Sequence, residues 1–222
     1  MATATAQAAP PATNRYTIDG VSFATYLALR ADLDRSGRQV RMAFDRGTLE
    51  IMAPLSYEHN HLSSFLHNFI IAVAFELRLP IAASGSTTLH RDDLDRGAEP
   101  DESFYFANAP RVRGHKRIDL PDDPPPDLVM EVDVSRSSVD KLAIYAALGV
   151  GEFWRLDDGM ILLYELVPEG EYRTVETSRN LPTVARSEIE GWIRQAASMD
   201  FMDWLHAVHN WSRETLLPRL GE

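Results

Sequence analysis

Cysteine is absent from this sequence of 222 residues, which excludes disulfides and thiolate metal sites. The absence fits a reducing compartment, and we expect a cytoplasmic protein. No apolar run approaches the ~18 residues of a membrane-spanning helix, so we expect no membrane association. Residues 1–14 lack the basic start and apolar centre of a secretory signal. Their Ala, Thr and Pro content predicts a flexible tail.

Lysine is almost missing from the basic residues. Of the 22 Lys and Arg residues, only Lys116 and Lys141 are lysine. The two side chains differ chemically, because the lysine ammonium is a compact point charge whose pKa shifts readily. A sequence that uses arginine nearly everywhere therefore draws attention to Lys141.

Positive charge is also scarce, since the formal net charge is -11. An acidic surface counts against tight, non-specific binding of nucleic acid. Metal-binding carboxylates add negative charge as well, so the balance does not exclude a nuclease. One local basic cluster has two interpretations, a solvated loop or a surface that follows phosphates, and the first is slightly favoured. Its members are Arg111, Arg113, His115, Lys116 and Arg117.

The periodicity of apolar residues predicts an α/β fold with a mixed central sheet flanked by helices. Helices are predicted over 22–36, 56–79, 137–148 and most of 187–217. Strands are predicted over 39–44, 48–53, 81–90, 101–106, 127–134, 152–157, 160–167 and 172–176. Polar segments at 91–97 and 107–126 predict a turn and a loop. A parallel crossover is expected from 127–134 through 137–148 to 152–157. We expect a tail (1–15), a core (16–180) and a C-terminal helical extension (181–222).

Two acidic residues are predicted on neighbouring strands. Alternation along 127–134 places Asp127, Val129, Glu131 and Asp133 on one face. A carboxylate in mid-strand is costly unless it is paired or binds metal. Together with Asp101 at the start of 101–106, Glu131 could hold a hard divalent cation, Mg²⁺ or Mn²⁺.

Lys141 follows this strand, early in the predicted helix 137–148. A cation there opposes the helix dipole. One interpretation is a solvent-facing lysine paired with Asp140 or Glu131, and the other is a catalytic group that stabilises charge or positions water. The two acids and the scarcity of lysine favour the second. Tyr145 shares a helix face with Lys141; packing against the sheet is favoured over a hydrogen bond to phosphate.

Four motifs in order resemble the Uma-two family of the PD-(D/E)XK restriction-endonuclease superfamily. They are Glu99-Pro100-Asp101, the run 126–132 (PDLVMEV), the run 141–145 (KLAIY) and the run 149–154 (GVGEFW). The resemblance implies a nuclease-like core, and usually a homodimer. It implies that Asp101 and Glu131 are the metal-binding acids, and that Lys141 is the catalytic lysine displaced to the following helix. Asp133 occupies the superfamily's usual lysine position. Glu58 corresponds to an additional acid near the metal.

Histidine and tryptophan add weaker signals. His59 and His61 are two apart on a helix, so they face different directions and predict no two-histidine metal site. Helix-surface or core positions are expected for them, although Glu58 and His61 could face one site. Trp154 is expected in the core. The C-terminal tryptophans are expected to bury against the domain or a partner chain: Trp192, Trp204 and Trp211.

Three hypotheses follow for function. The leading one is a Mg²⁺-dependent endonuclease that hydrolyses phosphodiester bonds, with DNA as partner. The second is a non-catalytic binding or scaffold protein that keeps the fold, which the net charge and Asp133 favour. The third is a nuclease whose contacts to DNA come from a separate partner protein.

Overall fold

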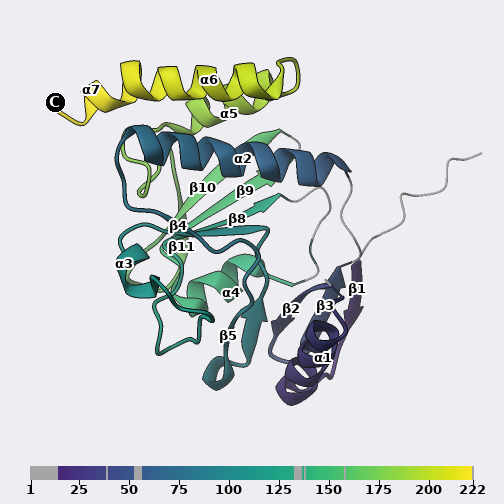
Figure 1. Ribbon diagram of the computed structural model, residues 1–222. Helices are drawn as coiled ribbons and strands as arrows, with labels where there is room; N and C mark the ends of the chain where they lie inside the picture. The colour runs from purple at the N-terminus through teal and green to yellow at the C-terminus, as the bar shows by residue number, and fades with distance from the viewer. Residues whose placement is uncertain are drawn as a thin grey trace, which may run out of the picture.

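The computed structural model describes residues 15–38, 40–52, 57–132, 137, 139–157 and 159–221, except for the side chain of Glu58. These residues form two sheets with helices between and outside them (Figure 1). Helices α5 and α6 lie outermost at the top of the view, followed by α2, the six-stranded sheet, α4 and the five-stranded sheet with α1. No helix in this described part of the chain is both long enough and apolar enough to cross a bilayer.

The five-stranded sheet is antiparallel and has the order β1-β3-β2-β6-β5. Its strands are β1 (Arg15–Ile18), β2 (Arg41–Asp45), β3 (Thr48–Met52), β5 (Leu89–Arg91) and β6 (Arg96–Ala98). The β2–β3 hairpin turns at Arg46-Gly47, where both residues have positive φ. Helix α1 (Phe23–Arg35) begins after Ser22, whose hydroxyl accepts a hydrogen bond from the Thr25 amide. Its buried Tyr26 packs on Phe44.

The six-stranded sheet is mixed and has the order β11-β10-β9-β8-β7-β4. Its strands are β4 (Ala82–Ala83), β7 (Glu102–Tyr105), β8 (Leu128–Val132), β9 (Glu152–Asp157), β10 (Met160–Leu166) and β11 (Tyr172–Val175). Strands β8 and β9 are parallel and are joined through α4 (Lys141–Leu148), so the predicted crossover is confirmed. Every residue of β8 is buried, because helices cover both faces of the strand.

Helix α2 (Tyr57–Glu76) supplies the main core on one face of this sheet. Leu128, Met130 and Val132 of β8 belong to the same apolar cluster as α2, whereas Val129 packs with α4 on the opposite face. This alternation is the one that the sequence predicts. Glu131 has the same parity as Val129 and therefore points toward α4.

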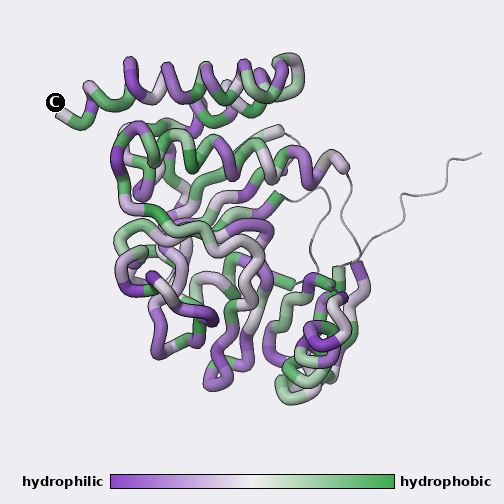
Figure 2. The backbone as a smooth tube through the Cα atoms, viewed as in Figure 1, coloured by the Kyte–Doolittle hydropathy of each residue, from purple (hydrophilic) through white to green (hydrophobic). Residues whose placement is uncertain are grey.

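The C-terminal segment adds an outer layer over α2. It comprises α5 (Arg186–Ala196), α6 (Phe201–Trp211), a π-helical turn (Ser212–Leu216) and α7 (Leu217–Arg219). Figure 2 shows hydrophilic residues on the outer side of α6 and hydrophobic ones on the side toward α2. Trp204 packs edge-on against Phe65 of α2, and Trp192 and Trp211 join the same core. Trp154 and Trp204 are buried, and Trp192 and Trp211 are partly buried against the same core, so the expectation that the tryptophans pack against the domain is confirmed.

Most predicted elements are present and the fold class is confirmed, but the segment 81–98 is different. A single strand over 81–90 is wrong: β4 and β5 belong to different sheets, separated by a turn in which Gly85 has a φ of 57°. The predicted turn at 91–97 contains a short 3-10 helix (Asp92–Leu94) and most of β6. The predicted loop 107–126 contains the single-turn helix α3 (Ala109–Val112). Local sequence does not show such switches between sheets.

The packing at Gly97 gives a test of this arrangement. A Cβ atom there would lie 2.8 Å from the Tyr26 hydroxyl and 3.0 Å from the His90 Cβ. We expect Gly97→Ala to lower the free energy of unfolding by about 1–3 kcal/mol, because overpacking forces neighbours apart. Gly191→Ala in α5 is the matched control; its Cβ would meet only an arginine tip at 4.0 Å. That change should raise stability by about 0.5–1 kcal/mol through helix propensity. Urea unfolding measures both, and equal effects would contradict the packing at Gly97.

Candidate active site

The central feature of the site is the buried carboxylate of Glu131 in β8. Only 4% of this residue is exposed. One carboxylate oxygen accepts a hydrogen bond from Lys141 Nζ at 2.7 Å, and the other accepts one from the Tyr145 hydroxyl at 2.6 Å. A carboxylate in an apolar sheet needs such compensation, because burying an unpaired charge is costly.

Lys141 and Tyr145 reach Glu131 because they are four residues apart on α4. The helix begins at Lys141, later than the predicted 137, because the Asp140 side chain caps it by accepting a hydrogen bond from the Ala143 amide. The side chain of Lys141 is only 10% exposed, so it is not directed into bulk solvent. Tyr145 is fully buried and stacks on Phe153, and burial raises the pKa of its hydroxyl. Tyr145 thus packs against the sheet and also binds Glu131.

Asp101 lies immediately before β7, the strand that pairs with β8, and is held by three groups. Its Oδ2 accepts a hydrogen bond from the Val132 amide at 2.7 Å and lies 3.0 Å from His59 Nε2. Its Oδ1 forms an ion pair with Arg41 of β2. Only 4% of Asp101 is exposed. The structure therefore anchors this acid to the main chain of β8 one residue after Glu131.

His59, in the first turn of α2, lies beside Asp101, and the charge of Glu131 also influences its pKa. Burial, followed by the positive charge of Arg41, lowers the pKa of His59 to about 4, while the negative charge of Glu131 acts in the opposite direction. At neutral pH His59 is therefore an uncharged imidazole beside Asp101. His61 points elsewhere, since its ring stacks on Tyr57 and meets Phe65 edge-on. The two histidines face different directions, as the sequence predicts.

A third buried acid, Glu99, anchors the segment that leads to Asp101. Its Oε1 accepts hydrogen bonds from Arg30 Nη1 at 2.5 Å and from the Thr88 hydroxyl at 3.3 Å. Burial raises the pKa of Glu99 to about 7, despite the nearby Arg30 charge. This contact ties α1 to the strand connection immediately before Asp101.

The β2–β3 hairpin reaches the site from the five-stranded sheet. The fully buried Glu50 accepts hydrogen bonds from Arg15 at 2.9 Å and from the Ser137 hydroxyl at 2.8 Å. Two residues further along β3, the Met52 sulfur lies 3.9 Å from Lys141 Nζ. Glu50 thus contacts Ser137 in the segment before α4, and Met52 contacts Lys141, the first residue of that helix.

Sequence reasoning identified some of these residues and missed others. It selected Glu131, Lys141 and Tyr145, which the structure joins by direct hydrogen bonds, and Asp101, which lies immediately before the neighbouring strand β7. It did not select Arg41, His59 or Glu50 as site residues. Their partners come from distant segments, so spacing along the chain carries no signal of the contacts. The Glu58 side chain and Asp133 lie outside the described residues.

The donor set fits a hard divalent cation. Glu131 in β8 and Asp101, just before the adjacent strand β7, are buried carboxylates, and Mg²⁺ needs only one or two carboxylates beside water and substrate oxygens. Arg41 and Lys141 supply the positive charge around these acids. Among the described residues, no three His, Asp or Glu side chains come together as a ready-made metal cage.

Two pockets adjoin the acids. One of about 480 Å³ opens beside Glu131 and Lys141, between the start of α4 and strands β9 and β10. Another of about 330 Å³ opens beside Asp101 and Arg41, along a polar face of α2 that carries Asn60 and Ser63. Glu131 therefore borders the first pocket and Asp101 borders the second.

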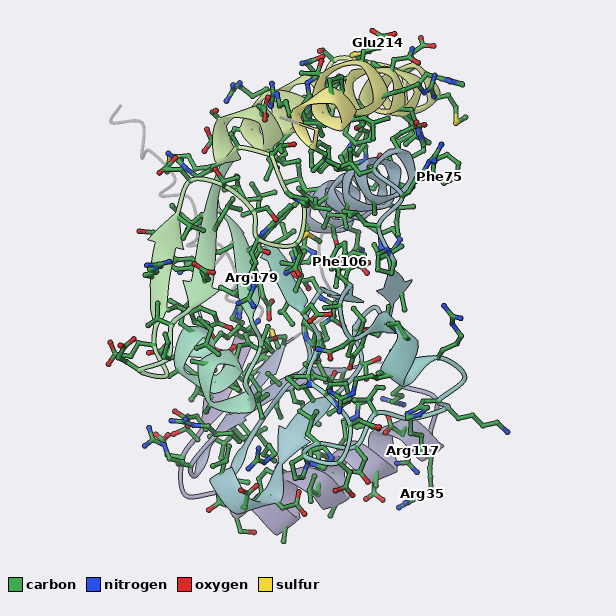
Figure 3. All side chains as sticks on the ribbon, turned by 90° about the vertical axis from the view of Figure 1, so that its left-hand side faces the viewer. Arg35, Phe75, Phe106, Arg117, Arg179 and Glu214 are labelled. Carbon is green, nitrogen blue, oxygen red and sulfur yellow. The ribbon has the colours of Figure 1, made fainter. Side chains whose placement is uncertain are left out.

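The basic cluster predicted at 111–117 lies away from these pockets. Its five members are exposed, in and after α3. In Figure 1, α3 lies at the left of the sheet. The ends of β3, α2, β8 and α4 that carry the site residues lie toward the right. Figure 3 shows Arg117 projecting near Arg35 of α1. The structure thus supports the solvated-loop interpretation.

The sequence from residue 23 to 198 matches the model of a family named Uma2 and described as "Putative restriction endonuclease". A comparison of folds found the crystal structure of "a putative nuclease belonging to DUF820" from Anabaena variabilis. The likeness has 13% sequence identity and a TM-score of 0.46, and it covers 68% of this chain and 90% of that chain. A comparison with curated protein sequences gave no match.

The hydrogen bond between Tyr145 and Glu131 gives a test of the site's architecture. Tyr145→Phe keeps the ring on Phe153 but removes a donor from a buried carboxylate, so we expect it to destabilise the fold by about 1–3 kcal/mol. Tyr164→Phe removes a hydroxyl from another ring on Phe153 without altering Glu131, and should change stability by less than ~0.5 kcal/mol. Urea denaturation compares the two variants. If they lose the same stability, the contact to Glu131 has no special weight.

Proposed function

Since this chain belongs to the family described as "Putative restriction endonuclease", we propose that it is a divalent-metal-dependent nuclease that cleaves phosphodiester bonds, with DNA as its substrate. The observation that carries the proposal is the buried Glu131 carboxylate, held by Lys141 and Tyr145 one strand from Asp101. An arrangement of two buried acids and a lysine beside an open pocket is costly for stability alone. A catalytic use explains why it is present.

Asp101 and Glu131 are the residues that would hold Mg²⁺ or Mn²⁺. Their oxygens are hard ligands, and substrate phosphate and water complete the coordination that Mg²⁺ prefers. The metal, when bound, supplies a Lewis acid for the phosphate and lowers the pKa of an attacking water. Arg41 and His59 hold Asp101 in one orientation, and Tyr145 holds Glu131.

Lys141 is the group that would stabilise charge developing on the phosphate. Its ammonium lies at the wall of the larger pocket with Glu131 as its hydrogen-bond partner. The helix dipole disfavours a cation at this position, so the contact with Glu131 is what keeps it there. A preorganised cation needs no reorganisation when negative charge builds up, which is the main source of its catalytic effect.

A second candidate function is a binding protein without catalysis. The observation in its favour is that Arg41 and Lys141 already neutralise Asp101 and Glu131 as ion pairs. The net charge of -11 also favours a third arrangement, in which a partner protein supplies the contacts to DNA. We also propose that the protein forms a homodimer, as the resemblance to the Uma-two family implies.

A cleavage assay tests the catalytic proposal. With Mg²⁺ or Mn²⁺ and plasmid, linear duplex and single-stranded DNA, we expect Asp101→Asn, Glu131→Gln and Lys141→Met each to reduce cleavage by about 100-fold or more. Lys116→Met is the matched control, because it removes the other lysine, in the exposed loop, and should leave cleavage unchanged. Asp122→Asn is a control for the loss of an exposed acid. Cleavage that survives in all three site variants would refute these assignments.

Titration calorimetry with Mn²⁺ separates the nuclease from the binding protein. We expect Glu131→Gln to weaken Mn²⁺ binding by about tenfold or more, because it removes a ligand charge. Lys141→Met should bind Mn²⁺ as tightly as the native protein or more tightly, since a competing cation is lost. A native protein that binds no Mn²⁺, alone or with DNA present, would favour the non-catalytic function.

A further inference from the structure

The side chains that line the larger pocket change from acidic through basic to apolar along one row. In the parallel pairing of β8 with β9, Glu131 lies opposite Arg155, and in the antiparallel pairing of β9 with β10, Arg155 lies opposite Leu162. These three side chains line the pocket in a row. Since neighbouring strands are about 4.8 Å apart, Leu162 lies about 10 Å from the acid. The floor therefore runs from a carboxylate through a guanidinium to an apolar side chain.

The far end of this row is an exposed apolar shelf. Met160, which pairs with Asp157 across the β9–β10 turn, is 65% exposed, and Leu162 is 38% exposed. Both line the same pocket as Glu131. Exposed apolar side chains beside a polar cleft are typical of surfaces that bind a ligand.

Arg155 stands between the shelf and the acid. Its side chain is 31% exposed and lies 3.3 Å from Asp157, another residue of the pocket. A guanidinium is the side chain best suited to grip a phosphate through two parallel hydrogen bonds. Lys141, which is hydrogen-bonded to Glu131, also lines the pocket. A phosphate group in the pocket would therefore meet two cations.

We propose that this pocket binds one unpaired nucleotide of the substrate strand, with its phosphate on Arg155 and its base on Met160 and Leu162. This deepens the proposed function, on which it rests, by naming the substrate class. The pocket volume of about 480 Å³ accommodates a nucleotide, and lies within the range of about 300–1,000 Å³ of small-ligand sites. A base that packs on the shelf has left its stack, so single-stranded or frayed DNA binds better than blunt duplex.

The pocket's acids set a condition on this binding. Glu131, Asp140 and Asp157 contribute three negative charges against the two positive charges of Lys141 and Arg155. A phosphate dianion or diester is therefore held more tightly when a divalent cation offsets the acids. Binding of the nucleotide and of the metal should be mutually supportive, because each reduces the repulsion that the other meets.

Fluorescence anisotropy with the full chain tests the proposal. The probes are a labelled single-stranded oligodeoxynucleotide and its blunt duplex, with Ca²⁺ in place of Mg²⁺ to limit cleavage. We expect the native protein to bind the single strand about fivefold more tightly than the duplex, because stacking on the shelf needs an unpaired base. Arg155→Met and Leu162→Ser should each weaken binding of the single strand about fivefold or more.

Two matched controls isolate the pocket. Arg173→Met removes an exposed arginine from β11, and Leu217→Ser removes a leucine of α7 that is 39% exposed. Both should change the dissociation constant by less than about twofold. Circular dichroism melting of every variant verifies folding. Light scattering shows whether Leu162→Ser alters the oligomeric state, and a change there without a change in DNA binding would assign the shelf to a second copy and overturn the proposal.

The outcomes separate this inference from the nuclease proposal. If the native protein cleaves DNA and the pocket variants bind like their controls, the nucleotide site is overturned and the nuclease stands. If Arg155→Met and Leu162→Ser lose binding while no condition gives cleavage, the nucleotide site stands and catalysis is refuted. Equal affinity for duplex and single strand, or no binding by the native protein, overturns the nucleotide site.

Discussion

The negative charge of Glu131 in the middle of β8 is the constraint on which the rest of the site depends. The effective penalty for burying an ion is several kcal/mol, and it is repaid only when the geometry of its partners is good. Here both carboxylate oxygens have a donor from α4, one charged and one neutral. The β8–α4 connection must therefore deliver Lys141 and Tyr145 to fixed places, and the Asp140 cap sets where that helix starts.

The two acids are compensated in different ways, and this difference bears on chemistry. Asp101 is fixed by the main chain of β8, by a neutral imidazole and by an arginine of the other sheet. Glu131 is held by a single helix. A cation that binds Glu131 would compete with Lys141, which belongs to one helix. A cation that binds Asp101 would compete with Arg41, whose ion pair joins the two sheets. Glu131 is therefore the acid whose partners can rearrange more readily.

The sequence predicts the parts of the site that depend on regular spacing. Period-two alternation in β8 placed Glu131 opposite the α2 core, and the four-residue spacing of α4 placed Lys141 beside Tyr145. It also predicted the parallel crossover, because a strand, helix and strand of these lengths connect in one way. It did not predict the split of 81–98 between two sheets, since short strands there are set by their partners. For the same reason Arg41, His59 and Glu50 were not recognised: each meets its partner across the fold.

The hairpin of β2 and β3 makes the order of synthesis relevant to the site. Arg15 contacts both Glu50 and Met52, and these residues in turn face Ser137 and Lys141. A chain emerging from the ribosome therefore leaves the Glu131 carboxylate without its two donors until α4 follows and docks between the sheets. The contacts of Glu50 with Ser137 and of Met52 with Lys141 join residues far apart in the sequence. Such contacts form slowly, because the chain must first lose the entropy of closing a long loop. The surroundings of Glu131 are thus completed only when the fold is nearly finished.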